Sequence, residues 1–186
     1  MRAVLERPER VGDPIALTVN FCAPSRGEFT VATKVARTNR SSQHWQATPP
    51  LPTLTALTWV AQYELRFAEG LSERSETTFD PPRSPRSVLW LRDAEPRPLD
   101  FVSLAALSDA FFGRIFQVIG RIPPFGTVSM TTYFHASADE LAAHGTAPLA
   151  AVADARIFHR SFGDQTAELF GANGQLLATA VQVAFF

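Results

Sequence analysis

The chain has 186 residues and a net charge of −1 at pH 7 with the two signs interspersed, which argues against a broad nucleic-acid-binding surface. Its 46% apolar content and 15 Phe suffice for a substantial core or for contact with an apolar ligand. One cysteine excludes a disulfide framework and a cysteine-based metal site. The N-terminal residues lack an apolar signal region, and no apolar run reaches about 18 residues, so we expect a cytoplasmic protein that does not cross a membrane.

The N-terminal third is predicted to form short strands. Residues 15–21 and 29–37 alternate in polarity and carry β-branched side chains, and residues 41–47 form a weaker third strand. The segment TPPLP at 48–52 interrupts regular structure. It is the first candidate domain boundary.

A long helix is predicted in the middle of the chain. Two short strands, at 60–67 and 87–92, precede it and are separated by a polar, Pro-rich loop. The helix covers residues 100–118, with Asp100 as N-cap because its carboxylate can accept the free amide protons of the first turn. Gly120 ends this region.

Four strands are predicted after the helix, at 127–135, 148–160, 165–170 and 175–186, the second of them irregular around Asp154. The Asn-Gly pair between the last two strands is typical of a type I′ hairpin turn. Strands that can pair in sequence around one hydrophobic helix predict an α+β fold, in which an antiparallel sheet wraps over the helix.

Asp109 is the most unusual residue of the predicted helix. At helical spacing it shares a stripe with Ala105, Phe112 and Phe116. A charge in such surroundings is expensive, so the carboxylate must be paired, neutralised or used in chemistry. A structural carboxylate bound to a backbone amide remains an equal alternative on this evidence alone.

Gln182 is the one large polar residue on one face of the last predicted strand. Period-two alternation puts it on the same face as Ala178 and Ala180, which leave room for a helix to approach. The opposite face, with Val181, is also mostly apolar, so we expect the strand to be covered on both sides. If the helix packs on the Ala face, Gln182 and Asp109 meet and satisfy each other's hydrogen bonds.

Residues 86–186 resemble the second half of the acyl-CoA thioesterase II (TesB-like) family, whose members have a double-hotdog fold. Several blocks carry the resemblance in the right order over about a hundred residues, which is more specific than any single motif. These blocks are Trp90-Leu91-Arg92, Pro98-Leu99-Asp100, Leu107-Ser108-Asp109, Gly126-Thr127-Val128-Ser129, Tyr133-Phe134-His135 and the run from Asn173 to Gln182.

The resemblance implies a catalytic group formed by Asp109, Thr127 and Gln182. Asp109 would deprotonate a water, and Thr127 and Gln182 would hold that water or the aspartate. The water would attack the thioester of an acyl-CoA substrate and release free acid and CoA. No covalent intermediate, metal or cofactor other than the CoA of the substrate is implied.

The resemblance also implies a domain organisation. Residues 15–47 resemble part of the first hotdog, so we expect a truncated N-terminal hotdog at 1–54 and a C-terminal hotdog with the catalytic residues at 55–186. An incomplete sheet edge invites association, and hotdog sheets commonly join, so a homodimer is expected.

Two other functions stay open. A non-catalytic acyl-CoA-binding or assembly protein would keep the hotdog without turnover. A hotdog dehydratase or hydratase ranks low, because it needs a His near the helix and none lies between His44 and His135. Ser129 is not in a nucleophile elbow, the four His lack metal-ligand spacing, and Cys22 is interpreted as a buried free thiol.

Overall fold

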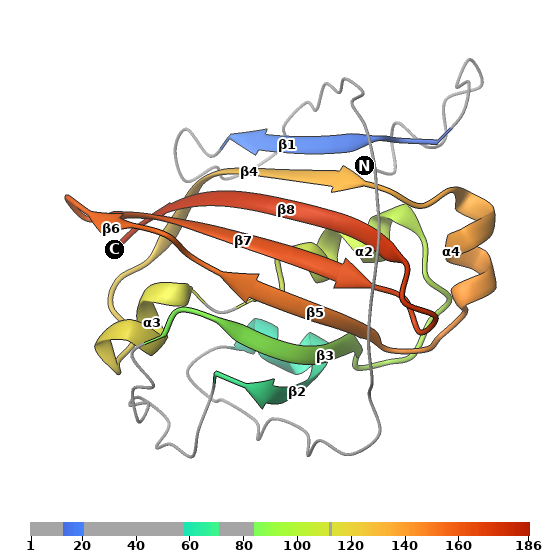
Figure 1. Ribbon diagram of the computed structural model, residues 1–186, viewed down its shortest axis with the longest axis horizontal. Coiled ribbons are helices and arrows are strands. Elements are labelled where there is room, and N and C mark those ends of the chain that lie inside the picture. Colours follow the sequence, from blue (N-terminus) through green and yellow to red (C-terminus); the bar gives the residue numbers. More distant parts are fainter. Residues whose placement is uncertain (1–12, 21–57, 71–83, 112) are drawn as a thin grey trace.

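The protein is described by a computed structural model that covers residues 13–20, 58–70, 84–111 and 113–186. One antiparallel sheet dominates it, with strand order β1-β4-β8-β7-β5-β3-β2 and β6 paired to β7 (Figure 1). The strands are β1 (Ala16–Asn20), β2 (Tyr63–Glu69), β3 (Ser87–Asp93), β4 (Gly126–Phe134), β5 (Leu149–Asp154), β6 (Phe158–His159), β7 (Phe162–Phe170) and β8 (Leu176–Phe185).

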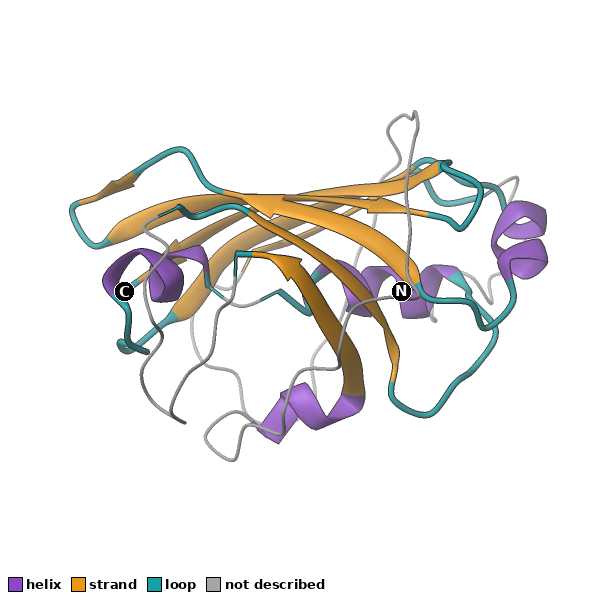
Figure 2. Cartoon of the chain, turned by 60° about the horizontal axis from the view of Figure 1, so that its bottom comes forward, coloured by secondary structure: helices purple, strands orange, loops and turns teal. Residues whose placement is uncertain are grey.

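The sheet curves over helix α2 (Phe101–Ser108), which lies against its inner face (Figure 2). Leu104 and Leu107 of α2 are almost completely buried, and so are Ala178 and Ala180 of β8. The small side chains on β8 allow the helix backbone to approach the sheet closely. The predicted α+β arrangement, with an antiparallel sheet around a hydrophobic helix, is confirmed.

The predicted single helix over 100–118 is wrong, because the chain forms two helices there. The first is α2, and the second is α3 (Arg114–Ile119), which begins after Gly113. Ser108 donates its hydroxyl proton to the Leu104 carbonyl at 2.7 Å, a bond that competes with regular helix continuation. Gly113 has a non-helical backbone (φ −52°, ψ 120°), and glycine costs about 1 kcal/mol in a helix interior.

The ends of both helices follow the capping rules. Asp100 accepts the Ser103 amide proton at 2.6 Å, as predicted for an N-cap. Gly120 ends α3 in the left-handed region (φ 72°), where a residue with a Cβ would be strained. The break between the helices places Asp109 at the C-terminal end of α2 rather than in the middle of a helix.

Three smaller predictions need correction. The strand expected at 60–67 begins later, because a 3-10 helix η1 (Thr58–Gln62) precedes β2. The β7–β8 hairpin exists, but its loop spans residues 171–175 and Asn173 lacks the positive φ of a type I′ turn. The outer face of β8 is not covered, since Val181 and Phe185 are 44% and 46% exposed.

Helix α4 (Ala138–His144) was not predicted, although its signal is present in the sequence. Ser137 and Glu140 form a capping box, in which the Ser137 side chain accepts the Glu140 amide proton and the Glu140 carboxylate accepts that of Ser137. The helix connects β4 to β5 and packs Leu141 into the core. It lies at the end of the sheet opposite α3 (Figure 1).

The expected division at 54/55 stays a prediction. Most of residues 1–54, including Cys22 and the strands predicted at 29–37 and 41–47, lies outside the described residues. Strand β1 is described, and it pairs with β4 to form one edge of the sheet. No helix in the described part of the chain has the length and apolar character of a membrane span.

Candidate active site

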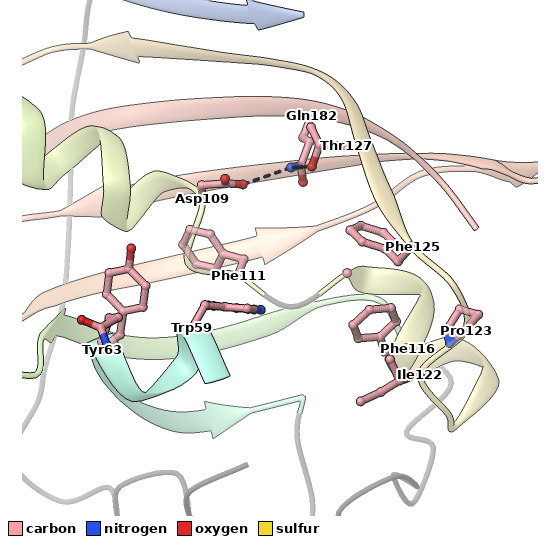
Figure 3. A pocket seen from close by; sticks show the side chains of 12 residues that line it. Trp59, Tyr63, Asp109, Phe111, Phe116, Ile122, Pro123, Phe125, Thr127 and Gln182 are labelled. Carbon is pink, nitrogen blue, oxygen red and sulfur yellow. Dashed lines mark hydrogen bonds between the residues drawn. The ribbon is translucent and has the colours of Figure 1, made fainter. Parts of the chain in front are cut away.

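The three residues singled out in the sequence meet at one point (Figure 3). Asp109 lies at the end of α2, Thr127 near the start of β4, and Gln182 in the second half of β8. Strand β4 shifts register against β8 between Thr127 and Ser129. A bulge of this kind redirects a side chain, and here it accompanies a Thr127 hydroxyl that faces Gln182.

The Gln182 amide joins the other two side chains. Its Nε2 donates to Asp109 Oδ1 at 3.1 Å and to Thr127 Oγ1 at 2.6 Å. Gln182 is only 4% exposed, so these bonds satisfy a polar group that would otherwise be costly to bury. Because the Thr127 oxygen accepts from Gln182, its own proton is left to donate to another group.

The carboxyl group of Asp109 has an unusual pKa. The side chain is exposed, but its accessible surface opens on a cavity rather than on a flat surface, so protein surrounds it on most sides. This desolvation raises the pKa to about 6, and the hydrogen bond from Gln182 opposes the rise by stabilising the carboxylate. Phe116, from the stripe predicted around Asp109, lines the same cavity, whereas Phe112 lies outside the described residues.

The cavity beside Asp109 has a volume of about 490 Å³ and mostly apolar walls. Five aromatic residues from two stretches of the sequence, 59–63 and 111–125, form much of the wall: Trp59, Tyr63, Phe111, Phe116 and Phe125. Asp109, Thr127 and Gln182 are placed along one side of it (Figure 3). An apolar pocket with a few convergent polar groups is the usual form of a small-molecule site.

Close packing fixes part of the aromatic wall. The Phe116 and Phe125 rings meet edge to face at 5.1 Å, and those of Trp59 and Tyr63 at 6.3 Å. A Cβ at Gly113 would lie 2.7 Å from the Phe125 ring, so only glycine allows this approach. This wall could not be predicted from the sequence, although the 15 Phe are consistent with contact to an apolar ligand.

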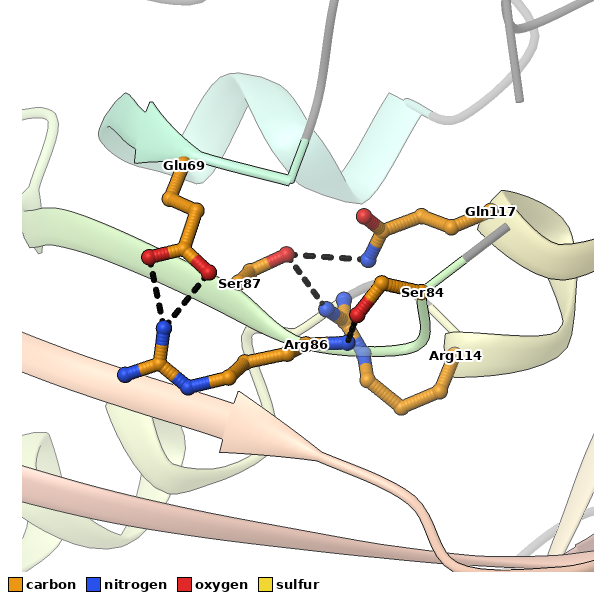
Figure 4. A network of polar contacts seen from close by, with 6 residues as sticks. All are labelled: Glu69, Ser84, Arg86, Ser87, Arg114 and Gln117. Carbon is orange, nitrogen blue, oxygen red and sulfur yellow. Dashed lines mark hydrogen bonds and ion pairs between the residues drawn. The ribbon is translucent and has the colours of Figure 1, made fainter. Parts of the chain in front are cut away.

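A second polar cluster joins α3 to the start of β3 (Figure 4). Arg114, Ser87 and Gln117 are each at most 1% exposed. Arg114 Nη1 donates to Ser87 Oγ at 2.7 Å, and Gln117 contacts the same oxygen at 2.9 Å in either orientation of its amide. Burial lowers the pKa of Arg114 to about 10, so the guanidinium keeps its charge at pH 7.

Other charged residues near the sheet edge are engaged in ion pairs. Arg86 contacts Glu69 at 2.5 Å, and Arg92 contacts Glu64 at 2.5 Å. Within the described residues, no group of three or more His, Cys, Asp or Glu side chains is placed to hold a metal ion. The polar side chains that meet at the cavity are the Asp109 carboxylate, the Thr127 hydroxyl and the Gln182 amide.

An antiparallel sheet wrapped around α2, with polar groups at the end of that helix, defines a hotdog-fold protein. The family of the acyl-CoA thioesterase C-terminal domain matches residues 23–186. The chain therefore belongs to this family, and family membership supports acyl-CoA thioesterase activity in general. No curated protein has a significantly similar sequence.

Solved structures agree on the fold. The chain is similar to a hotdog-fold protein of unknown function from Alicyclobacillus acidocaldarius, with 28% identity and a TM-score of 0.79, over 99% of this chain and 82% of that one. A protein assigned provisionally as a thioesterase II from Thermobifida fusca has 16% identity and a TM-score of 0.63 over 99% and 82%. The tesB protein of Mycobacterium avium subspecies paratuberculosis has 19% identity and a TM-score of 0.52 over 77% and 56%.

Proposed function

We propose that the protein hydrolyses acyl-CoA thioesters with Asp109 as the general base that activates a water molecule. The observation that carries this proposal is the Gln182 amide, which binds Asp109 and Thr127 together at the wall of an apolar cavity. These bonds satisfy the buried amide, and they also hold a carboxylate and a hydroxyl at a space large enough for a ligand.

The reaction begins with a water held between Asp109 and Thr127. Asp109 Oδ1 is occupied by Gln182, and within the described residues Oδ2 has no hydrogen-bond partner in the protein. Oδ2 is therefore the atom that takes the proton as the water oxygen adds to the thioester carbonyl carbon. The tetrahedral intermediate then breaks its C–S bond, and the proton on Asp109 passes to the departing sulfur. The products are the free acid and the thiol of CoA.

The pKa of Asp109 suits this role. A general base works best when its pKa lies close to the working pH, and burial brings this carboxyl to about 6. At pH 7 most of the group is ionised and able to accept a proton. An ordinary exposed aspartate, with a pKa near 4, would be ionised more completely but would be a weaker base.

The lining of the cavity favours an uncharged, apolar acyl group as the part of the substrate that binds there. Among its described wall residues, only Asp109 and Tyr63 are ionisable. Burial and the nearby Asp93 and Asp109 carboxylates raise the pKa of Tyr63, so its phenol stays neutral at pH 7. An acyl chain with a terminal carboxylate would meet apolar side chains without a positive charge and would be excluded.

Two assays with the purified full chain test the proposal. A thiol-release assay with saturated acyl-CoA esters of several chain lengths should show turnover. A single turnover with excess enzyme in ¹⁸O-labelled water should place one ¹⁸O atom in the released acid, because the attacking oxygen comes from water. Transfer of an unlabelled enzyme oxygen in that first turnover would instead mean attack by the Asp109 carboxylate.

The non-catalytic alternative has its own outcome. If every ester raises the melting temperature without thiol release, the protein binds acyl-CoA and does not hydrolyse it. Neither turnover nor stabilisation would reject both functions. The expected homodimer stays a prediction, which the molar mass in solution can test.

A further inference from the structure

Gln165 lies directly opposite Gln182 in the sheet. The two residues are register partners on β7 and β8. Side chains of such partners stand close together on the same face of a sheet. Gln165 Nε2 donates to Gln182 Oε1, and Gln165 Oε1 accepts the backbone amide proton of Arg114 at 3.1 Å.

The direction of the Gln182 amide matters for the site. The two ends of a carboxamide have nearly the same shape and opposite hydrogen-bonding character. Only one orientation presents the NH₂ group to Asp109 and Thr127, as the structure has it. The reversed orientation would place the Gln182 carbonyl oxygen against the Asp109 carboxylate, so two acceptors would face each other.

The backbone amide of Arg114, at the other end of this series of hydrogen bonds, determines which orientation the two side-chain amides take. The amide proton of Arg114 can only donate, so the group of Gln165 that faces it must be the carbonyl oxygen. The Gln165 NH₂ group then faces Gln182 and requires the carbonyl oxygen of Gln182 on its side. This leaves the Gln182 NH₂ group for Asp109 and Thr127. One fixed main-chain donor thus determines the orientation of two side-chain amides in succession.

We propose that Gln165 is a positioning residue that holds the Gln182 amide in the orientation required by Asp109 and Thr127. Gln165 acts through Gln182 and is distinct from the three residues proposed to take part in the reaction. Its part in catalysis rests on the proposed function. Its effect on the orientation of Gln182 does not.

A purely structural role for Gln165 is the alternative. Gln165 Oε1 accepts the Arg114 amide proton in the first turn of α3, where the N-cap Gly113 makes no side-chain hydrogen bond. Loss of Gln165 would then weaken α3 and lower stability without any specific effect on Asp109. The experiments below separate the two roles.

The first experiment follows the Asp109 carboxyl by ¹³C NMR titration in the wild type, in Gln165→Met and in Gln175→Met. The donated bond from Gln182 holds the Asp109 pKa down, so losing its orientation in Gln165→Met should raise that pKa by roughly 0.5 or more. Tyr63 is the other ionisable group among the described wall residues, and its raised pKa keeps it neutral over the titrated range. An unchanged Asp109 pKa in Gln165→Met would overturn the proposal.

Gln175→Met is the matched control, because it makes the same chemical change at a distance. The Gln175 amide donates to Glu140 at 2.6 Å, near α4 and away from the cavity. The pKa of Asp109 should not move in this variant. An equal shift in both variants would mean that the effect is a general one and would also reject the positioning role.

The second experiment is a double-mutant cycle on thiol release. Gln165→Met should lower kcat/KM roughly 10-fold in the wild-type background and less than about 2-fold in a Gln182→Ala background, because its effect passes through Gln182. The same loss in both backgrounds would assign Gln165 a structural role only. If Gln165→Met does not fold, Gln165→Glu replaces it at pH 8, since a carboxylate still accepts from Arg114 but cannot donate to Gln182.

The two experiments also distinguish this proposal from the proposed function. If the wild type hydrolyses no ester, the thioesterase proposal fails, and the NMR titration still decides the role of Gln165. If the wild type is active and Gln165→Met changes neither kcat/KM nor the Asp109 pKa, only the positioning role fails.

Discussion

Two polar clusters in the described part of the chain differ in their access to water. The cavity cluster is Asp109, Thr127 and Gln182, and its carboxylate opens on a space of about 490 Å³. The buried cluster is Arg114 with its neighbours Ser87 and Gln117, all at most 1% exposed. The backbone of Arg114 and the side chain of Gln165 connect the two.

Desolvation acts on the charged group of each cluster with opposite consequences. It lowers the pKa of Arg114 to about 10, which leaves the charge unchanged at neutral pH. It raises the pKa of Asp109 to about 6, close enough to neutrality for proton transfer. Desolvation of a charge is thus common to both clusters. A cavity for a ligand and a pKa near the working pH mark only the cavity cluster as a candidate for chemistry.

The largest expected effect is on catalysis, from Asp109→Asn. This variant keeps an oxygen for the Gln182 bond but cannot accept a proton, so kcat should fall about 100- to 10,000-fold, the usual contribution of a general base. Steady-state thiol release measures the change.

The matched control is Asp100→Asn at the other end of α2. Asn is as good an N-cap as Asp, so both kcat and stability should stay close to wild type. A similar loss of activity in the two variants would mean that the effect of Asp109→Asn is not specific to the end of α2 at the cavity.

The next effect in size is on stability, from Ser87→Ala in the buried cluster. The substitution leaves the Arg114 guanidinium and the Gln117 amide without a shared partner, which should cost about 1–3 kcal/mol. Urea denaturation measures the free energy of unfolding. The kcat of the folded variant should remain within about 2-fold of wild type, since Ser87 does not line the cavity. A large drop in kcat would show that the two clusters cannot be separated by function.

A third prediction concerns chain length. Ile122 lines the cavity and is partly buried, so Ile122→Ala should lengthen the space for the acyl group. The ratio of kcat/KM for a longer ester to that for a shorter one should rise roughly 10-fold, the scale on which apolar pockets discriminate by size. Ile119→Ala is the control, because Ile119 is 39% exposed and is not among the wall residues. Equal profiles for both variants would place the acyl chain elsewhere.

The last prediction is a pH-dependent gain in stability for Asp109→Asn. The folded-state pKa of Asp109 lies above its unfolded value near 4, so the native state binds the proton more tightly. This group therefore lowers stability as pH rises from about 4 through 6, and Asn removes that penalty. The melting temperature of Asp109→Asn should exceed that of wild type at pH 8, and the difference should shrink toward pH 4. A constant difference across this range would mean that the pKa of Asp109 is not raised.

Local rules in the sequence predicted much of the fold. Period-two alternation put Gln182 on the Ala-rich face of the last strand, and the helix does pack there. Asp100 was recognisable as an N-cap from its position before an apolar segment. These features depend on residues close together in the chain, so they can be predicted without knowledge of the tertiary structure.

The remaining features depend on packing between distant segments. The break after Ser108 could not be predicted, because the apolar pattern continues through Phe111 and Phe116. The approach of Phe125 to Gly113 also forms only in the folded protein. Gln165 gave no signal either. Its importance comes from standing opposite Gln182 in the sheet, a register that the sequence does not encode locally.

The pH dependence of kcat/KM, measured in parallel for wild type and Asp109→Asn, tests the role of Asp109 most directly. We predict that the wild-type value falls about tenfold per pH unit below pH 6, as the carboxylate becomes protonated. The low residual activity of Asp109→Asn should lack this transition. A wild-type profile that stays flat down to pH 4.5, or a transition near pH 6 that persists in Asp109→Asn, would contradict the account.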